Sequence, residues 1–406
     1  MIFEPDTVKG FQDFLPPESQ KRNAVKKIVE DQFLVYGFLP METPLIEFDE
    51  LMRSDSLGEE DEAISDRFRL KDKAGRNLGI RYEFTFQLAR IFKQNPNIKM
   101  PFRRYQIEKN LRDEPTGPGR FKEFTQCDID VIGDSSQECE AECISAWSDI
   151  LKNLGIKAEF HVNNRKLINS ILESIKIVSK EEVMKELDKI DKIGEDEVKS
   201  NLKKYADSMQ ILTIFKMFEK NLDFFVDNLF DGADEIKKLE KNLKNYGVKT
   251  VFNPFLVRGL SYYTGNIIEI KIQGQKSSIG GGGRYDKLVG KYLGREIPAF
   301  GLSCGLERLT ELAKIKINAI RVIVISLNQN SISVKTIQKL RKNDISSIIF
   351  YGKPGKALEY ANSYQIKNAI FIGEDEVSKK KFKLRDLSTG NEKMLTEKQL
   401  IAFLKD

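Results

Sequence analysis

Residues 101–133 read PFRRYQIEKNLRDEPTGPGRFKEFTQCDIDVIG, and this stretch predicts the core of the fold. Polar and apolar residues alternate on both sides of the turn PTGPG, a pattern typical of two strands joined by a tight, exposed loop. In the second strand Gln126, Asp128 and Asp130 share one face, and apolar residues share the other. Two carboxylates and an amide on one face favour a cationic ligand if that face lines a cleft, and are ordinary if it is a solvent-facing edge.

The two flanks of the loop carry side chains suited to a nucleotide. Arg112 and Arg120 have planar guanidinium groups that can clamp phosphate oxygens. Glu114 has the same strand parity as Arg112, and Phe124 on the other flank can stack on a base. Arginine-rich hairpins also occur on plain protein surfaces, so this pattern alone leaves both interpretations open.

The composition excludes several kinds of chemistry. His161 is the single histidine among 406 residues, so no metal site with two imidazoles can form, and no motif assigns His161 more than a structural role. The four cysteines include no CxxC pair, which indicates buried or half-exposed thiols in a reducing compartment. No apolar stretch approaches the roughly 20 residues of a membrane span. We therefore expect a cytosolic protein without a membrane segment, and the length suggests roughly two to four domains.

Periodicity predicts further elements outside residues 101–133. A helix is expected from Glu18 onward, because apolar residues recur at helical spacing as far as Tyr36. Residues 165–250 are rich in Lys and Glu and contain no proline, which predicts a helical insertion, and residues 266–272 alternate as a strand. The glycines at 280–283 permit close approach of the backbone to a ligand or a neighbouring strand, and they also suit a loop.

The last part of the chain has a different pattern. Short apolar runs alternate with amphipathic segments, as in a small open sheet with helices, and we place a domain boundary near residue 317. The expected strands are residues 322–327, 345–350 and 369–372. Residues 318–406 hold 16 Lys and Arg against nine Asp and Glu, a net charge of about +7. Because the whole chain has a net charge of +5, residues 1–317 carry about −2. This excess indicates either a solvated lysine surface or a nucleic-acid face.

Several motifs resemble those of the class II aminoacyl-tRNA synthetases. The stretch from Arg112 to Phe124 resembles motif 2, GLSCGLERL at 301–309 resembles motif 3, and GFLPMETPLIE at 37–47 resembles motif 1. Four further segments narrow the resemblance to the histidyl-tRNA synthetases. They are LVRGLSYYTG (256–265), GGGGRYDKLV (280–289), KGFQDFLP (9–16) and IRYEFT (80–85).

This resemblance implies both an architecture and an activity. It implies an α+β catalytic domain over residues 1–317, with a mixed, mostly antiparallel sheet and a helical insertion at about 165–250, and an α/β anticodon-binding domain over 318–406. The implied assembly is a homodimer built through motif 1. The implied reaction activates L-histidine with ATP to histidyl-adenylate and transfers histidine to the 3′ end of tRNA(His), releasing AMP and diphosphate. Mg²⁺ is the implied cofactor, and the sequence does not identify its ligands.

The resemblance also implies roles for particular residues. The implied catalytic residues are Arg112, Arg258 and Arg308. The implied ATP-binding residues are Arg112, Glu114, Arg120, Phe124 and Arg308. The implied histidine-binding residues are Glu83, Thr85, Arg112, Gln126, Asp130, Arg258, Tyr262 and Tyr263. Outside its motif, a tyrosine pair such as Tyr262 and Tyr263 would be interpreted as core aromatics.

Three features depart from the family pattern. Ser261 stands where the family commonly has Asp, and Asp130 is shorter than the Glu that is frequent at its position. The loop PTGPGR lacks the basic and amide residues of many bacterial members, which leaves open how the acceptor end, including any extra 5′ guanosine, is recognised.

Two alternative functions would be consistent with only part of these motifs. A non-catalytic paralogue regulates ATP phosphoribosyltransferase without charging tRNA, but such paralogues usually lose the catalytic arginines and the anticodon domain. A class II synthetase for another amino acid, such as proline or threonine, needs motifs 2 and 3 only, and the RGLSYY segment argues against it.

Overall fold

The computed structural model describes most of the chain. The described residues are 5–52, 67–117, 119–257, 262–274, 278–316 and 320–405. The protein folds as two compact units, the larger containing Val25–Ile315 with Met1–Asp13 and the smaller containing Lys316–Asp406 with Phe14–Ala24. The predicted boundary at residue 317 falls outside the described residues and stays a prediction.

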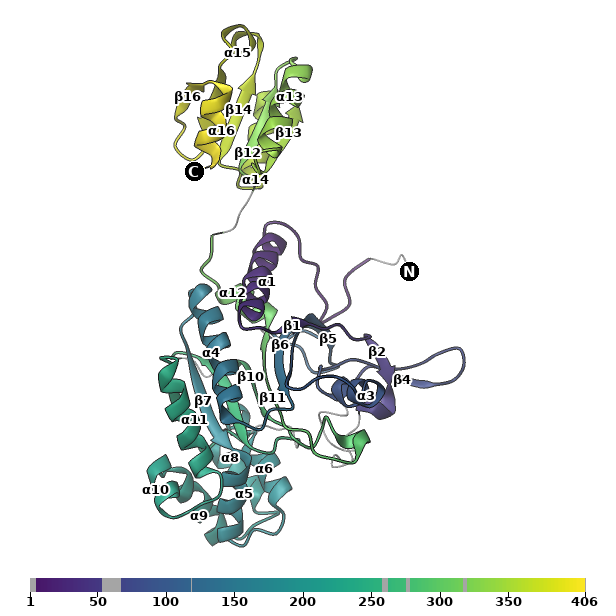
Figure 1. Cartoon of the computed structure of the whole chain (residues 1–406), viewed down its shortest axis with the longest axis vertical. Helices are drawn as coiled ribbons and strands as arrows, with labels where there is room; N and C mark the ends of the chain where they lie inside the picture. Colours follow the sequence, from purple (N-terminus) through teal and green to yellow (C-terminus); the bar gives the residue numbers. More distant parts are fainter. Residues whose placement is uncertain are drawn as a thin grey trace. The chain divides into compact units, whose positions relative to one another are not determined.

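An eight-stranded sheet forms the centre of the larger unit (Figure 1). In spatial order its strands are β1 (Leu39–Pro40), β5 (Phe102–Leu111), β6 (Glu123–Ile132), β11 (Ala299–Gly305), β10 (Ser278–Arg284), β9 (Asn266–Ile272), β7 (Ala158–Asn164) and β8 (Thr250–Phe252). β1 runs parallel to β5 and β8 parallel to β7, while each neighbouring pair between them is antiparallel. The predicted mixed, mostly antiparallel sheet is therefore confirmed.

Helices cover the apolar face of this sheet. The long helix α4 packs on β6 and β11, where Trp147 is fully buried and donates to the Leu302 carbonyl at 3.4 Å. Helix α1 joins the same core through Phe33, whose ring centroid lies 5.3 Å from that of Trp147. Outside the insertion, the helical segments before the smaller unit's sheet are α1 (Glu18–Val35), of which the part from Val25 onward belongs to the larger unit, η1 (Asp49–Met52), α3 (Phe86–Gln94), α4 (Gln137–Asn153), η2 (Lys291–Leu293) and α12 (Leu306–Leu312). The other face of β5, β6 and β11 is polar.

The glycine run forms strand β10 in the middle of the sheet and is not a loop. A Cβ atom at Gly280 would meet the Ser303 carbonyl oxygen, and one at Gly282 would meet the Gly301 carbonyl oxygen. The predicted close approach to a neighbouring strand is thus confirmed, and it explains why side chains are missing from β10.

The predicted helical insertion is confirmed as seven helices between β7 and β8. They are α5 (Arg165–Ser174), α6 (Lys180–Leu187), α7 (Ile190–Ile193), α8 (Glu195–Leu202), α9 (Ser208–Phe218), α10 (Leu222–Asp227) and α11 (Ala233–Asn245). Helix α11 packs on α4, so the apolar residues of the insertion continue the core of the larger unit. A separate three-stranded sheet contains β2 (Ile46–Phe48), β4 (Asn77–Ile80) and β3 (Arg69–Lys71).

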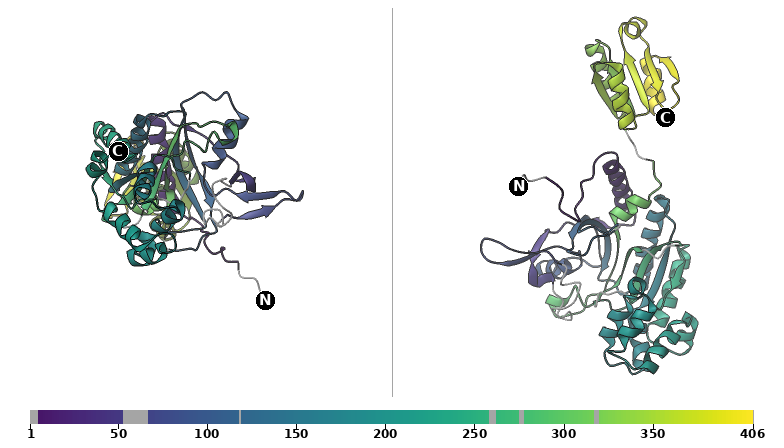
Figure 2. Two further views of the ribbon diagram at one scale, coloured as in Figure 1. Left: turned by 90° about the horizontal axis from the view of Figure 1, so that it is seen from below. Right: turned by 180° about the vertical axis from the view of Figure 1, so that it is seen from behind.

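The smaller unit is a five-stranded mixed sheet with helices (Figure 2). In spatial order its strands are β13 (Ser347–Tyr351), β12 (Val322–Ser326), β14 (Asn368–Ile372), β15 (Phe382–Asp386) and β16 (Glu392–Leu395). Its helices are α13 (Asn330–Arg341), α14 (Pro354–Ser363), α15 (Glu374–Lys379) and α16 (Glu397–Lys405). The three predicted strands are confirmed as β12, β13 and β14, which run parallel with β13 at the sheet's edge, and the antiparallel pair β15–β16 was not predicted.

Among the helices of the described residues, none is long and apolar enough to span a membrane.

Candidate active site

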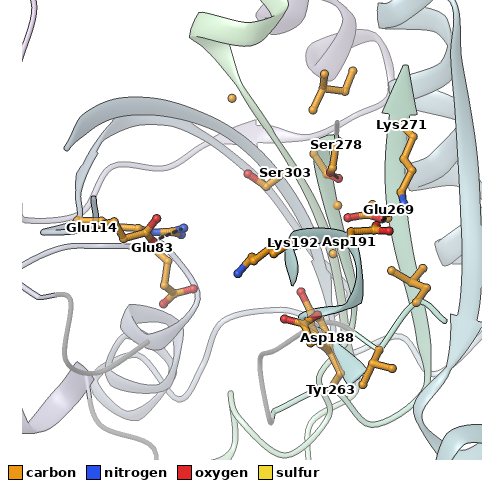
Figure 3. A pocket seen from close by; sticks show the side chains of 18 of the residues that line it. Glu83, Glu114, Asp188, Asp191, Lys192, Tyr263, Glu269, Lys271, Ser278 and Ser303 are labelled. Carbon is orange, nitrogen blue, oxygen red and sulfur yellow. Dashed lines mark hydrogen bonds and ion pairs between the residues drawn. The ribbon is translucent and has the colours of Figure 1, made fainter. Parts of the chain in front are cut away.

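A cavity of about 1650 Å³ lies in the larger unit, and the sheet contributes residues of β6, β9, β10 and β11 to its lining (Figure 3). It gathers eleven of the twelve predicted site residues. They are Glu83, Thr85, Arg112, Glu114, Arg120, Phe124, Gln126, Asp130, Tyr262, Tyr263 and Arg308. The twelfth, Arg258, lies outside the described residues, as does Ser261, so the roles predicted for them stay predictions.

Strand register places the polar side chains in rows across the sheet. Asp128 pairs with Gln106 on β5 and with Ser303 on β11, and Gln126 lies one row along. Gln126 donates to the Ser303 hydroxyl at 2.9 Å, and that hydroxyl donates to Asp128 Oδ1. Asn110 holds the other atom of the Gln126 amide, because it donates to Gln126 Oε1 at 2.5 Å. The polar face predicted from alternation is therefore a hydrogen-bonded wall of the cavity and not a solvent-facing edge.

The next row holds an ion pair that is almost completely buried. Arg104 Nη2 lies 2.7 Å from Asp130 Oδ2, and the Tyr285 hydroxyl donates to Asp130 Oδ1. Gly301 on β11 faces this carboxylate, and a Cβ there would meet Asp130 Oδ1. Burial raises the pKa of Asp130, and the charge of Arg104 opposes that rise. Both oxygens of Asp130 are thus held in place by the protein itself.

Glu83 occupies the start of helix α3. Its carboxylate accepts from the backbone N–H groups of Thr85 and Phe86 at 2.8 and 2.7 Å, which satisfies donors that a helix leaves free at its first turn. Burial raises the pKa of Glu83, and these hydrogen bonds and the charge of Arg112 counter part of the rise. The helix terminus therefore fixes the direction in which this carboxylate faces the cavity.

Aromatic rings line the cavity close to these carboxylates. Tyr262 has its ring centroid 4.9 Å from Tyr263, 5.9 Å from Phe86 and 6.0 Å from Tyr285. Burial raises the pKa of Tyr262 well above its ordinary value, so its hydroxyl stays protonated and can donate. A flat, polar-edged ring can therefore lie between these tyrosines and the carboxylates of β6.

Guanidinium groups gather at the other end of the cavity, around Phe124. The Arg112 guanidinium carbon lies 5.1 Å from the Phe124 ring centroid, and Arg112 Nε donates to the Tyr82 carbonyl at 3.1 Å. Burial lowers the pKa of Arg308, and the nearby charge of Arg120 lowers it further. Like charges brought this close favour an anionic ligand between them.

Two family models match the chain over these features. The model described as Histidyl-tRNA synthetase matches residues 10–309, and the model described as Anticodon binding domain matches residues 320–406. The chain belongs to the histidyl-tRNA synthetase family. It is 37% identical to Histidine–tRNA ligase 1 of Bacillus cereus, over 96% of this chain and 94% of that protein.

Solved structures of the family agree with this fold. A histidyl-tRNA synthetase from Nostoc sp. PCC 7120 matches with a TM-score of 0.86 and 26% identity, over 99% of both chains. A Bacillus halodurans C chain described as an ATP phosphoribosyltransferase regulatory subunit/histidyl-tRNA synthetase matches with a TM-score of 0.75 at 19% identity. That second match covers 91% of this chain and 99% of the other, and it shows a likeness of fold alone.

The structure adds lining residues that sequence reasoning did not assign to the site. Tyr285 lies in the quoted segment GGGGRYDKLV and Ser303 in the motif 3 segment GLSCGLERL, so these motifs were the available signal. Glu307, in the same segment as Ser303, accepts from the backbone N–H of Thr125 through both carboxylate oxygens, at 3.0 and 3.1 Å. Asp128 was placed on the polar face by alternation but given no role.

Helices α6, α7 and α8 of the insertion form the wall opposite the sheet. Lys271 on β9 joins the two walls, because its Nζ atom lies 3.0 Å from Asp191 on α7 and 3.2 Å from Glu269 on β9 (Figure 3). Lys192, the next residue on α7, extends toward the open middle of the cavity in the same view. Nothing local in residues 180–202 signals this position, because it depends on how the insertion packs.

The single histidine lies apart from the described lining. His161 is on β7, paired in register with Glu269, and its Nε2 atom is 3.4 Å from Glu159 Oε2. The four cysteines, Cys127, Cys139, Cys143 and Cys304, are buried free thiols, as predicted.

Proposed function

We propose that this chain acts as a histidine–tRNA ligase, activating L-histidine with ATP and transferring it to the 3′ end of tRNA(His). The observation that carries the proposal is a single cavity that places a carboxylate-rich, tyrosine-lined end beside an arginine-rich end. The first end suits the ammonium and imidazole of histidine, and the second suits a nucleotide phosphate chain. Membership of the family supplies the reaction that connects them.

The first step joins the two ends of the cavity. A carboxylate oxygen of histidine attacks the α-phosphorus of ATP, the bond to the bridging oxygen breaks, and diphosphate leaves with that electron pair. We assign Arg112 to the α-phosphate and the substrate carboxylate, and Arg308 to the adenine and the γ-phosphate, with Phe124 stacking on the base. Glu114 and Arg120 complete the ATP contacts. Positioning and charge neutralisation suffice for such a step, which suits an enzyme with one histidine.

Selectivity for histidine follows from the buried end. We assign Glu83, Thr85, Gln126, Asp130, Tyr262 and Tyr263 to the amino acid. A pocket whose buried donors and acceptors all match one substrate rejects analogues by roughly 10⁴-fold, because unmatched groups stay unpaired. This selectivity would make a separate editing reaction unnecessary.

Arg258 has the sharpest predicted kinetic signature. Arg258→Ala should lower the rate of adenylate formation far more than ATP affinity, because a charge at the α-phosphate acts mainly in the transition state. Wild-type pyrophosphate-exchange rates in that variant would remove Arg258 from the catalytic set.

We propose that the second step uses the smaller unit to hold the tRNA. The family model over residues 320–406 and the lysines at 379–381 support an anticodon contact. A chain ending at residue 317 should keep adenylate formation and need a much higher tRNA concentration for charging. If adenylate formation collapsed in a folded, dimeric truncation, this division between the two units would be wrong.

Mg²⁺ is expected to enter with ATP. Among the described residues no group of three or more His, Cys, Asp or Glu side chains is placed to hold a metal ion. The described chain therefore supplies no preformed cage, which agrees with an ion held chiefly by phosphate oxygens and water.

We further propose a homodimer formed through the motif 1 region. Apolar side chains within and directly beside residues 37–47 are exposed in the single chain, with Val35 at 77%, Leu39 at 63% and Phe48 at 52%. A second copy could cover them, as exposed apolar clusters of this kind mark interfaces. Phe48→Asp should yield monomers by light scattering, and an unchanged dimer would place the interface elsewhere. The cytoplasm, where free thiols persist, is the proposed site of action.

Two assays separate the proposed function from its alternatives. Pyrophosphate exchange with a panel of amino acids should show histidine alone as an efficient substrate, and activity with proline or threonine would contradict it. Charging of tRNA(His) with labelled histidine should succeed. Failure of both assays in a folded protein would favour the regulatory paralogue.

A further inference from the structure

Asp128 stands at the centre of the cavity wall without a role in the proposed reaction. It lies on β6 between Gln126 and Asp130, on the face that lines the cavity, and is 7% exposed. The Ser303 hydroxyl donates to its Oδ1 atom, and the same hydroxyl accepts from Gln126. Asp128 is therefore held in a fixed orientation inside the amino acid end of the site.

The charges at this end do not balance among the described residues. Glu83, Asp128 and Asp130 contribute three carboxyl groups. Arg104 is 2.7 Å from Asp130, and Arg112 is the cation whose charge acts on Glu83. Within the described part of the chain, Asp128 has a hydroxyl partner where Asp130 has a guanidinium partner. Among the described residues, an ionised Asp128 would therefore have no guanidinium or ammonium partner at ion-pair distance of its own, and a cationic ligand could provide one.

We propose that Asp128 is a further substrate-binding residue, which pairs with the α-ammonium group of histidine. This inference rests on the proposed function and deepens it. The ammonium carries a full charge near neutral pH, whereas an imidazole with a pKa of about 6.5 is mostly neutral there. The ammonium is thus the part of the substrate that can pair with an ionised Asp128, and a charge-assisted hydrogen bond in a buried site is a strong one.

The protonation of Asp128 gives this pairing a second consequence. Burial raises the pKa of Asp128 to about 8, and the facing carboxylates of Asp130 and Glu83 add to the rise. Arg104 and the Ser303 hydroxyl oppose it. In the empty site Asp128 is therefore largely protonated near neutral pH. Binding of an ammonium lowers its pKa and releases a proton.

The test compares two ligands on the full-length protein and on Asp128→Asn, which keeps the side-chain shape and the acceptor for Ser303. The ligands are histidine and imidazole propionate, which has the same ring and carboxylate but no ammonium. Calorimetry should show histidine binding weakened by about 10- to 100-fold in the variant, with imidazole propionate changed by less than about threefold. An equal loss for both ligands would overturn the ammonium assignment, and no loss for either would remove Asp128 from the site.

A measurement on the unsubstituted protein keeps the inference testable if the variant does not fold. Histidine binding at about pH 7.5, measured in buffers of different ionisation enthalpy, should release a proton fraction that imidazole propionate does not release. Equal proton release for the two ligands would contradict the inference. If either test fails while the wild type still shows histidine-dependent pyrophosphate exchange, only this inference falls. A wild type that neither binds nor activates histidine would remove the proposed function as well.

Discussion

The two walls of the cavity are built in opposite ways. On the sheet wall, Arg104 and Gln106 are fully buried and Asp130 is 4% exposed, and their polar atoms bond to one another. On the insertion wall, charged side chains of α6 to α8 face water, as in the pair Lys199–Glu195 with side chains 38% and 52% exposed. Buried polar networks hold one geometry because any change leaves a group unpaired, whereas exposed ion pairs exchange readily with water. The sheet wall is therefore preorganised to recognise a small ligand, and the insertion wall can adapt.

The difference between the two walls is tested most strongly by removing a buried charge from the sheet and an exposed charge from the insertion. Arg104→Met should destabilise the larger unit by about 3–5 kcal/mol, because it leaves Asp130 buried beside Tyr285 without its ion-pair partner. Lys180→Met on α6, whose partner Glu173 is 60% exposed, should cost less than about 1 kcal/mol.

Tryptophan fluorescence during denaturant unfolding measures both variants. The chain has one tryptophan, Trp147, buried in the larger unit, so the signal reports on that unit alone. Equal stabilities for the two variants would show that the sheet wall is no more tightly organised than the insertion wall.

The next largest effect tests whether the cavity's arginines act in chemistry. Arg112→Ala should lower the pyrophosphate-exchange rate by about 10²- to 10³-fold, as expected when a donor to developing charge is lost. Arg76→Ala is the matched control, because Arg76 forms an exposed pair with Asp72 on the small β3–β4 hairpin and should keep full activity. A near-normal rate in Arg112→Ala would place the α-phosphate elsewhere.

A smaller effect separates binding from stability at Asp128. Its folded-state pKa of about 8 lies above the ordinary value of 3.8, so this group's contribution to stability falls as pH rises from about 4 to about 8 and levels off above that. Asp128→Asn should therefore be more stable than wild type in the empty state, by a margin that widens between about pH 5 and pH 9. Thermal unfolding across that range measures the margin, and a margin that stays constant would mean that Asp128 is already ionised in the empty site.

The smallest effect is expected on the insertion wall. Asp191→Asn removes the contact from α7 to Lys271, but Asp191 is 59% exposed and Lys271 keeps Glu269 at 3.2 Å. Histidine activation should change by less than about threefold in pyrophosphate exchange. A tenfold loss would show that α7 takes part in the first step and would end the contrast between the walls.

The sheet wall was largely predictable because its signal is local. Alternation along β6 placed Gln126, Asp128 and Asp130 on one face, and strand register then brought them to one cavity. The motifs supplied further lining residues, including Arg308 from a segment far along the chain.

Other features could be recognised only from the folded structure. The glycines of β10 carry no side chains, so nothing in their pattern distinguished a central strand from a loop. The partner of Asp128 is Ser303, distant in sequence, and the bond depends on β6 lying beside β11. The insertion wall was predicted as helix but not as cavity lining, because helical periodicity says nothing about where a helix packs.

A crystal structure of the full chain with histidine and a non-hydrolysable ATP analogue tests the assignment of the two walls most directly. Histidine should lie against β5, β6 and β11, with its ammonium within hydrogen-bond distance of Asp128 and its carboxylate near Arg112. The triphosphate should lie among Arg112, Arg120 and Arg308. Histidine bound instead to side chains of α6 to α8, with Asp128 more than one water molecule away, would contradict it.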